Sequence, residues 1–512
     1  MTARDLPEGW RRVHLVGIGG IAMSGLARLL VARGATVTGS DAVESRRLAS
    51  LRALGIPITV GNGPDSFDAS RLDGVELVVV APAVPTDDPE LAEARRRELR
   101  VLPRSAALAG LMAGHRGVAV AGSHGKTTVA MMLTAALQAC GEDPTFAVGG
   151  DPGEAGSHTH AGSSELMVVE ADEDVGAFWQ LQPYGAVLTG VAAEHLDHYR
   201  TMPALAASFA TFLRRVDPGG FLVACVDDTA GWALATAAAD HADRWRRAGG
   251  PDGRPADAAA HSTTGGQGTA GAGRPWLTGY GFGSSADVRL VAEEISIAGT
   301  SAEVVVHGVR LGRLSLRVPG RHHLLDAAAA LAAGIALGAP PAGLLAGLAE
   351  FAGVRRRFQP LGSAGGVRVV DDYANHPDRV AAAVEAARAA AGGGRVVVAF
   401  QPHLYSRTAL LADRFGAALG SADAVVVMDV YGAGEQPEPG AGGARVAAAT
   451  RAGAARAGAA RVVYEPSWSA VPGVLMDLAR PGDLVMTLGA GDVTQVGPEL
   501  LRLLAERSAL PG

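Results

Sequence analysis

The feature that most constrains the fold is a glycine-rich turn between an apolar strand and a long helix. The turn, Gly122-Ser-His-Gly-Lys-Thr-Thr128, follows the apolar run Val118–Ala121. A helical run, Thr127–Cys140, comes next, with Gly141 placed to cap its C-terminus. A strand joined to a helix in this way starts a βαβ unit, and such units build parallel sheets. The turn therefore predicts an α/β fold.

The same turn has the composition of a phosphate-binding loop. Its glycines let backbone N–H groups approach phosphates, and the helix N-terminus adds a positive dipole. Lys126 supplies a point charge, and the Thr127 hydroxyl can coordinate Mg²⁺. Lys126 is the single lysine among 45 cationic residues, which argues against the alternative of an ordinary polar turn. We expect nucleotide phosphates to contact Gly122, Ser123, His124, Gly125, Lys126, Thr127 and Thr128.

Two further residues are candidate metal ligands. Glu170 ends the apolar strand Leu166–Val169, where a carboxylate can face a Mg²⁺ held on Thr127. Acidic residues also end strands because water solvates them there, so both interpretations remain open. His195 is a candidate second ligand, although a lone histidine is often structural.

A second glycine turn lies near the N-terminus. Gly17-Ile-Gly-Gly-Ile-Ala22 follows the strand Val13–Val16, and Asp41 lies at the end of the next strand, Thr36–Gly39. This arrangement suits a dinucleotide, with Asp41 on a ribose hydroxyl. It suits a UDP group equally, because that diphosphate has the same charge and length. A separate ATP loop favours UDP, since hydride transfer does not use ATP hydrolysis.

The last third of the chain repeats the α/β pattern and carries dense polar runs. Its predicted strands are Val367–Val370, Val396–Phe400, Ala424–Met428 and Leu484–Leu488. Polar runs follow three of them, at 371–377, 401–408 and 431–435. Ligands of open α/β sheets bind beyond the carboxyl ends of strands. Arginine and histidine there can hold an amino acid's carboxylate and assist proton transfer from its amine; solvated loop ends are the alternative for each run alone.

Length and charge limit the class of protein. A chain of 512 residues is too long for one core, so three domains are expected. The net charge of -7 offers no broad attraction to nucleic acid or anionic lipid, so neither is expected as a partner. Two cysteines, Cys140 and Cys225, exclude a disulfide scaffold.

Two segments bear on location and order. The N-terminal segment has no continuous apolar leader, and the Ala-rich stretch 327–348 is broken by Gly338 and Pro340-Pro341. We read that stretch as a buried helix and its exit, and expect a cytoplasmic protein. Residues 240–275 are rich in Gly, Ala, Ser and Thr, which predicts a disordered insertion.

Together these segments resemble the Mur ligase family, which builds the peptide of peptidoglycan. The resemblance covers nearly the whole chain outside 240–275. It rests on Val16–Gly25, Gly122–Thr128, Glu170–Glu173, Phe400–Thr408, Tyr431–Glu435 and Leu488–Asp492. It implies a Rossmann-like UDP-sugar domain at 1–112, a central P-loop ATPase-type parallel sheet that binds ATP at 113–352, and a Rossmann-like amino-acid domain at 353–512.

The resemblance implies an ADP-forming ligation in peptidoglycan precursor synthesis. ATP would phosphorylate the lactyl carboxylate of UDP-N-acetylmuramate, and the amine of L-alanine would then attack the acyl phosphate. ATP, Mg²⁺ and these two substrates are the expected ligands of a monomer or homodimer. Three alternatives stay open: a paralogue that binds UDP-sugar or ATP without efficient ligation, a related murein-peptide ligase, and a nicotinamide oxidoreductase built on the Gly17 turn.

The resemblance also implies residue roles. The catalytic residues would be Lys126, which would neutralise the γ-phosphate, with His195, His403 and Arg407. Thr127 and Glu170 would hold one Mg²⁺ and His195 a second. The remaining ATP contacts would be His322 and Asp326 at adenine, Asp371 at ribose and Arg356 near the phosphates. The UDP-sugar would contact Gly17, Gly19, Gly20, Ser40 and Asp41, and the amino acid would contact Tyr373, His403 and Arg407.

The chain departs from the family pattern at six positions. Gly190, Ala192 and Glu194 stand where the family usually has Asn, Glu and its first Asp. The adenine motif His-Asn-x-x-Asn reads His322-His-Leu-Leu-Asp326, and His-His-Pro appears as Asn375-His-Pro377. An aspartate at 326 can accept from the adenine amino group but cannot donate to N7. We therefore expect nucleotide affinity or choice to differ from the family's.

Overall fold

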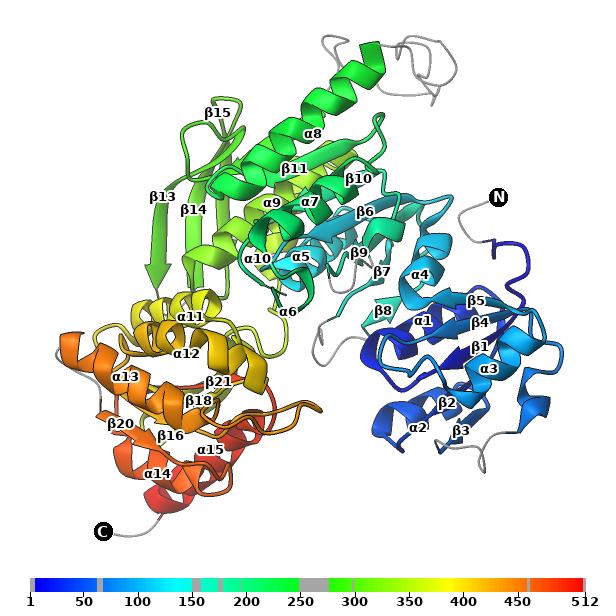
Figure 1. Cartoon of the computed structure of the whole chain (residues 1–512). Coiled ribbons are helices and arrows are strands. Elements are labelled where there is room, and N and C mark those ends of the chain that lie inside the picture. Colours follow the sequence, from blue (N-terminus) through cyan, green and yellow to red (C-terminus); the bar gives the residue numbers. More distant parts are fainter. Residues whose placement is uncertain are drawn as a thin grey trace. The chain divides into compact units, whose positions relative to one another are not determined.

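The computed structural model describes residues 5–61, 68–149, 158–173, 178–194, 196–247, 276–296, 299–457 and 461–509. The chain divides into two compact units (Figure 1). The first comprises Met1–Leu290, Val305–Leu311 and Asp326–Leu348, and the second comprises Val291–Val304, Gly312–Leu325 and Ala349–Gly512.

The first unit begins with a five-stranded parallel sheet in the order β3-β2-β1-β4-β5. Its strands are β1 Arg12–Val16, β2 Thr36–Asp41, β3 Ile58–Val60, β4 Leu77–Val80 and β5 Arg100–Pro103. The helices between them are α1 Ile21–Ala32, α2 Arg46–Arg52, the 3-10 helix η1 Ala69–Leu72, α3 Pro89–Arg96 and α4 Arg104–Met112. Strands β2 and β3 are added on one side of β1, and β4 and β5 on the other. The β1–α1 turn therefore lies where the strand order reverses, and such sheets bind ligands at that point.

The second sheet has ten strands in the order β15-β14-β13-β12-β11-β10-β6-β9-β7-β8. Its strands are β6 Arg116–Ala121, β7 Thr145–Ala147, β8 Thr159–His160, β9 Leu166–Glu170, β10 Gly185–Leu188, β11 Phe221–Cys225, β12 Leu277–Gly281, β13 Val288–Ser296, β14 Gly299–Val306 and β15 Val309–Leu316. The helices in this part of the chain are α5 Lys126–Ala139, α6 Leu196–Tyr199, α7 Met202–Leu213, α8 Thr229–Arg247, α9 Arg321–Leu337 and α10 Pro341–Glu350. Strand β6 lies between β9 and β10 and pairs with both in parallel.

The third sheet lies in the second unit, in the order β16-β17-β21-β18-β19-β20. Its strands are β16 Gln359–Ala364, β17 Val367–Asp372, β18 Val396–Gln401, β19 Ala424–Val427, β20 Arg461–Tyr464 and β21 Leu484–Gly489. Its helices are α11 Pro377–Ala391, α12 Tyr405–Leu419, α13 Gly443–Ala457, α14 Val471–Leu478 and α15 Val493–Ala509. Only the edge strand β16 pairs antiparallel; the other pairings are parallel.

The burial of whole strands explains why short apolar runs in the sequence predict strands. Strands β10, β18 and β21 are buried at every position, because helices cover both faces of a parallel sheet. In the third sheet the two faces form separate cores, one around Phe400 and Phe415 and the other around Val426 and Leu500. The predicted α/β class, with Rossmann-like sheets at both ends and a parallel central sheet, is confirmed. The domain boundaries at 112/113 and 352/353 stay predictions.

The predicted insertion was placed too early in the chain. Residues 240–247 belong to α8, and residues 248–275 lie outside the described residues. Ala235, Ala238 and Ala242 recur at helical spacing and are buried, so alanines that resemble low-complexity sequence in fact pack one helix face.

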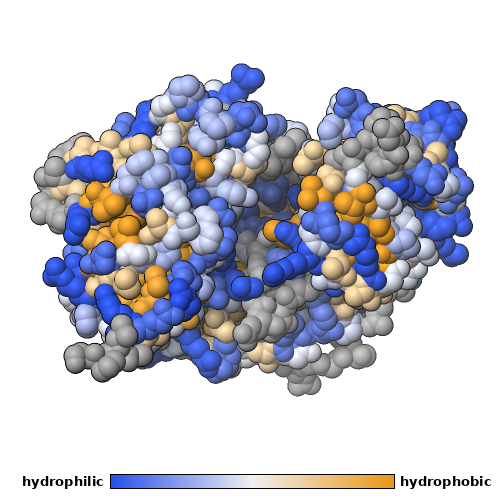
Figure 2. All heavy atoms as spheres, turned by 90° about the horizontal axis from the view of Figure 1, so that it is seen from below, coloured by the Kyte–Doolittle hydropathy of each residue, from blue (hydrophilic) through white to orange (hydrophobic). Residues whose placement is uncertain are grey.

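Cys140 and Cys225 are both free thiols. Among the described helices, none has the length and apolar character needed to cross a bilayer. On the face shown in Figure 2, apolar side chains reach the surface in small patches between polar ones.

Candidate active site

The turn between β6 and α5 is a tight loop that only glycine permits at two positions. Gly122 and Gly125 have left-handed φ angles of +130° and +79°. A Cβ at Gly122 would collide with Thr189, and one at Gly125 would collide with the Asp326 carboxylate of α9. The loop is tied to β10 because the Ser123 N–H donates to the Gly190 carbonyl at 2.9 Å. The turn is therefore held in one conformation with its amides at the start of a fourteen-residue helix.

The ammonium group of Lys126 is enclosed by this turn. Its Nζ donates to the Gly122 carbonyl at 2.8 Å and to Glu173 Oε2 at 2.6 Å. Lys126 and Glu173 are 7% and 1% exposed. Burial acts to lower the pKa of Lys126, but Glu173, Asp172 and Glu170 outweigh it and raise the pKa. The lysine is therefore fully charged near neutral pH.

The backbone of Glu173 is positioned by hydrogen bonds from α6 and α7. The Tyr199 hydroxyl donates to the Glu173 carbonyl at 2.5 Å, and Ser208 donates to the Tyr199 hydroxyl at 3.0 Å. Trp179 Nε1 donates to Ser208 Oγ at 3.0 Å. This chain of contacts from α6 and α7 fixes the backbone that carries the partner of Lys126.

Thr127 and Glu170 are in direct contact. The Thr127 hydroxyl lies 2.9 Å from both carboxylate oxygens of Glu170, and the Gly149 N–H donates to Glu170 Oε2 at 2.6 Å. A hydroxyl and a carboxylate are the hard oxygen donors that Mg²⁺ prefers, so these residues fit a magnesium ion beside the phosphate loop. His195, the predicted second ligand, lies outside the described residues.

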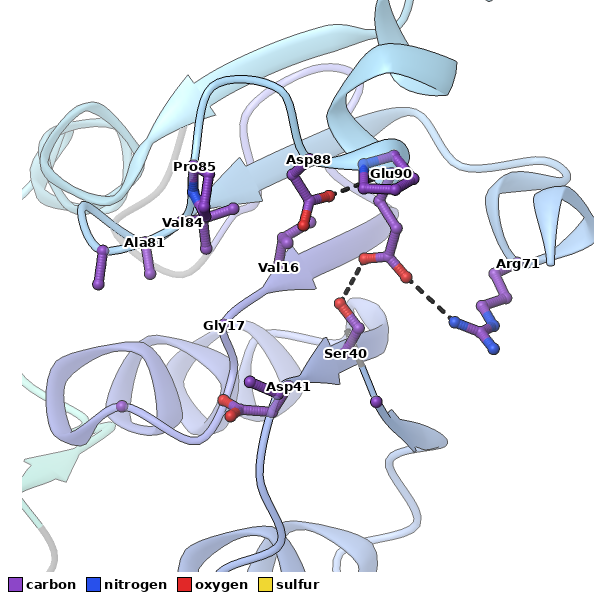
Figure 3. Close-up of a pocket in the computed structure, with 15 residues that line it drawn as sticks. Val16, Gly17, Ser40, Asp41, Arg71, Ala81, Val84, Pro85, Asp88 and Glu90 are labelled. Atoms are coloured by element: carbon purple, nitrogen blue, oxygen red, sulfur yellow. Dashed lines mark hydrogen bonds and ion pairs between the residues drawn. The ribbon is translucent and has the colours of Figure 1, made fainter. Parts of the chain in front are cut away.

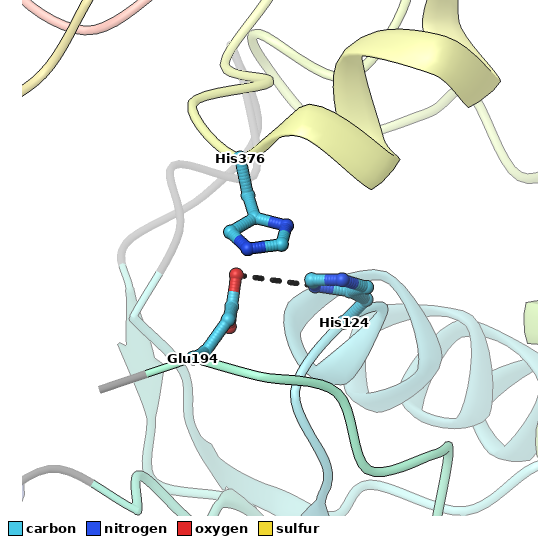
Figure 4. Close-up of side chains that lie close together, drawn as sticks. All are labelled: His124, Glu194 and His376. Carbon is cyan, nitrogen blue, oxygen red and sulfur yellow. Dashed lines mark ion pairs between the residues drawn. The ribbon is translucent and has the colours of Figure 1, made fainter. Parts of the chain in front are cut away.

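Glu194, one of the six departures, pairs with the phosphate loop. His124 Nδ1 lies 3.3 Å from Glu194 Oε1, and Figure 4 shows the carboxylate facing the imidazole. Gly190, another departure, has φ +155°, and a Cβ there would lie 3.0 Å from Asp228 Oδ2. Asp228 accepts from the Val191 N–H at 3.1 Å. The Asp228 side chain therefore lies close to position 190, where glycine leaves room for it.

The turn between β1 and α1 opens on a cavity of about 310 Å³ (Figure 3). Gly17, with φ +79°, and Gly20 line it together with Ser40 and Asp41. The Gly19 N–H donates to Asp41 Oδ2 at 2.7 Å. The structure thus brings together at one cavity four of the five residues predicted for the UDP-sugar, with Gly19 tied to them through Asp41.

A buried polar cluster lies at the same cavity. Glu90 Oε2 accepts from the Ser40 hydroxyl and lies 3.3 Å from His14 Nε2, while Arg71 Nη1 donates to Glu90 Oε1 at 3.2 Å. Figure 3 shows Ser40, Glu90 and Arg71 converging there. Burial would raise the pKa of Glu90, but contacts with His14, Ser40 and Arg71 outweigh it and lower the pKa. Glu90 thus stays an anion that orients Arg71.

In the second unit, Asp371 lies within a cage of donors. It accepts from Thr487 at 2.6 Å, Thr494 at 3.0 Å and Arg356 Nε at 3.1 Å. The Arg356 guanidinium also stacks 4.9 Å above the Tyr373 ring. The structure therefore joins three predicted site residues, Arg356, Asp371 and Tyr373, and Asp371 is only 1% exposed.

Two of the three residues predicted for the amino acid, His403 and Arg407, both contact Asn375 in the second unit. His403 Nδ1 lies 3.3 Å from Asn375 Nδ2, and Arg407 Nη1 donates to the Asn375 carbonyl at 3.4 Å. His403 stacks on Tyr431, with ring centroids 6.0 Å apart. Burial, followed by the Arg407 cation, lowers the pKa of His403 to about 4. His403 is thus neutral near pH 7.

The remaining predicted nucleotide residues lie on α9. Burial lowers the pKa of His322, and it lowers that of His323 to about 4. His323 Nδ1 donates to the Pro319 carbonyl at 2.8 Å, so His323 is a neutral structural residue. Asp326, four residues after His322, lies against Gly125 of the phosphate loop.

Three family models match consecutive parts of this chain. They are described as Mur ligase family, catalytic domain (residues 12–116), Mur ligase middle domain (120–270) and Mur ligase, glutamate ligase domain (356–491). The UDP-N-acetylmuramate–L-alanine ligase of Acidothermus cellulolyticus is 49% identical over 497 residues, 97% of this chain and 95% of that protein. The Mycobacterium tuberculosis protein of the same name is 46% identical over 522 residues, 100% and 99%. The chain belongs to the Mur ligase family.

Solved structures of Mur ligases share its fold. UDP-N-acetylmuramate-alanine ligase MurC from Thermotoga maritima has a TM-score of 0.73 and 26% identity, covering 98% of this chain and 100% of that one. The MurF ligase from Thermotoga maritima, in complex with ADP, has a TM-score of 0.60 and 16% identity, covering 98% and 100%.

The site of this Mur ligase contains residues to which sequence reasoning gave no role. Glu173 belongs to the Glu170–Glu173 segment that carries the resemblance, but the pattern predicts no role for it; in the structure its carboxylate accepts from Lys126 Nζ at 2.6 Å. Arg71 and Glu90 had no motif to mark them. The sequence shows only Glu90 in the first turn of a helix capped by Asp88, and its burial is seen in the structure alone.

Proposed function

We propose that this Mur ligase joins the lactyl carboxylate of UDP-N-acetylmuramate to the amine of L-alanine, with ATP cleaved to ADP and phosphate. The observation that carries the proposal is the enclosed Lys126–Thr127–Glu170 site on a glycine turn. Relatives 46–49% identical over nearly the whole chain, all named UDP-N-acetylmuramate–L-alanine ligase, support the substrate assignment.

In the proposed reaction, a carboxylate oxygen attacks the γ-phosphorus of ATP, and the bond to the bridging oxygen of ADP breaks. Lys126 stabilises the charge that develops on the transferred group, because its ammonium is already oriented and desolvated. The amides of Gly122–Thr128 bind the other phosphates. When Mg²⁺ is bound, Thr127 and Glu170 would hold it, and it would neutralise phosphate charge.

The residues proposed to bind the amino acid and take its proton lie in the second unit. The alanine amine attacks the acyl carbon, phosphate leaves with the acyl–oxygen bond electrons, and the amine loses a proton. Arg407 is proposed to bind the alanine carboxylate. Neutral His403 is proposed to take the proton, and Tyr373 to line the pocket. Arg356 and Asp371 are proposed at the phosphates and ribose, and His322 and Asp326 at adenine.

The test is phosphate release with ATP, UDP-N-acetylmuramate and an amino-acid panel, each substrate being omitted in turn. Release that requires all three, with L-alanine preferred, is the expected result. Nucleotide binding without release would instead indicate a paralogue that does not ligate. A preference for a different amine, such as a murein peptide, would indicate a related ligase.

A further inference from the structure

A second cavity of the first unit, of about 320 Å³, lies between α1, α4 and the ends of β7 and β9. One wall is apolar and includes Ile21, Leu26 and Leu108. The lining also includes two acidic residues, Glu170 and Asp172. Its volume lies within the range of small-molecule sites, and its mixture of apolar wall and few polar groups is typical of them.

Arg104 is the one cation among the described residues that line this cavity. It is half-buried at the start of α4, and its guanidinium has neither hydrogen bond nor ion pair with any part of the described chain. A guanidinium offers five N–H donors in a planar fork that matches a carboxylate. Leaving these donors partly desolvated without a partner costs free energy, so the position suits an anionic ligand.

The cavity is lined by residues that adjoin each of the two glycine turns. Ile21 directly follows the Gly17–Gly20 turn, where the UDP group is proposed, and Glu170 contacts Thr127 of the phosphate loop. A ligand with its nucleotide on the first turn and its reacting carboxylate at the second must cross this space. Ile21 is 40% exposed, which leaves an apolar surface for the carbon atoms of such a ligand.

We propose that Arg104 binds the carboxylate of the UDP-linked sugar acid and directs it toward the phosphate loop. The inference rests on the proposed function. The carboxylate must approach the γ-phosphate past Glu170, Asp172 and Glu173, all of which repel it. A bidentate guanidinium offsets that repulsion and leaves the outer lone pairs of the carboxylate free to attack phosphorus.

The experiment compares two ligands by calorimetry without ATP. UDP-N-acetylglucosamine has the same nucleotide and acetamido sugar as UDP-N-acetylmuramate but no carboxylate. Arg104→Ala should raise the Kd of UDP-N-acetylmuramate by about ten- to a hundredfold and leave the Kd of UDP-N-acetylglucosamine unchanged, which also shows that the variant is folded. Arg104→Lys should recover part of the affinity. Arg100→Ala, at an exposed arginine of β5 outside the cavity lining, is the matched control.

An equal loss of affinity for both ligands would overturn the inference, because Arg104 would then bind a group that the two ligands share, such as the diphosphate. Unchanged binding of UDP-N-acetylmuramate by Arg104→Ala would overturn it too. If the wild-type protein binds neither uridine nucleotide, the proposed function fails along with the inference. If the wild-type protein ligates and only the Arg104 comparison fails, the proposed function stands alone.

Discussion

The first unit contains two glycine turns of the same construction whose charged neighbours differ in sign. At the β1–α1 turn, the Asp41 carboxylate accepts from the Gly19 N–H at 2.7 Å. At the β6–α5 turn, the Lys126 ammonium donates to the Gly122 carbonyl at 2.8 Å. Amides and a helix dipole suffice to bind a diphosphate whose charge stays constant. A fixed cation is needed where charge develops during transfer.

The opposite charges at the two turns indicate that one fold element can serve binding or catalysis, depending on one side chain. Interactions that are equally strong before and during the reaction lower KM, whereas those that strengthen in the transition state raise kcat. We therefore propose that the first turn serves binding and the second phosphoryl transfer. Each variant below changes a residue that belongs to one of the two turns or contacts it.

The largest effect is expected for Lys126→Ala. The turnover number should fall by about 10²- to 10³-fold, because a preoriented charge is lost from a water-excluded site. The Kd of UDP-N-acetylmuramate, measured by calorimetry, should not change. Lys126→Arg should not restore turnover, since a planar guanidinium does not reproduce the compact ammonium that contacts Gly122 and Glu173. A variant that kept most of its turnover number would break the comparison.

Glu170→Gln should raise the Mg²⁺ concentration needed for half-maximal activity by at least about tenfold, because a neutral amide is a weaker ligand than a carboxylate. A magnesium titration at saturating ATP measures this. Glu142→Gln, at an exposed glutamate just beyond α5, is the matched control. An unchanged requirement would mean that Glu170 serves only as the acceptor for Thr127 and Gly149.

Glu173→Gln tests the carboxylate that supports the charge of Lys126. Burial lowers the pKa of Lys126, while Glu173 is the first of the carboxylates that raise it. Without Glu173, the ammonium should lose its proton at lower pH. The alkaline limb of the kcat profile should therefore move to lower pH. At the pH optimum the variant should keep part of the wild-type rate. A uniform loss of rate across all pH values would contradict this role.

The sequence was sufficient to predict the structure where the local pattern and the pairing of neighbouring strands determine the geometry. The run Leu166–Val169 predicted a buried strand, and Glu170 at its end does contact Thr127 at 2.9 Å. Metal binding by that pair stays a prediction. The βα spacing predicted the parallel strands of the three sheets, because a buried parallel strand needs a continuous apolar run, which is visible in the chain.

The sequence was insufficient where contacts depend on distant segments. Asp326 lies against Gly125 although some two hundred positions separate them, and nothing in α9 marks that proximity. Glu173 reaches Lys126 only because Tyr199 and its partners hold the chain after β9. Strands β13 to β15 were not predicted, since their alternating burial, unlike that of the core strands, carries no long apolar run.

The smallest effect is expected for Asp41→Ala at the first turn. The variant loses the acceptor for the Gly19 N–H and the proposed acceptor for a ribose hydroxyl, so KM for UDP-N-acetylmuramate should rise about tenfold. Steady-state kinetics should show unchanged kcat and unchanged KM for ATP, because this turn contacts no group whose charge changes. Asp87→Ala, at an exposed aspartate on the same domain, is the control. A fall in kcat with KM intact would mean that the first turn also stabilises the transition state, and the division between the two turns would then be wrong.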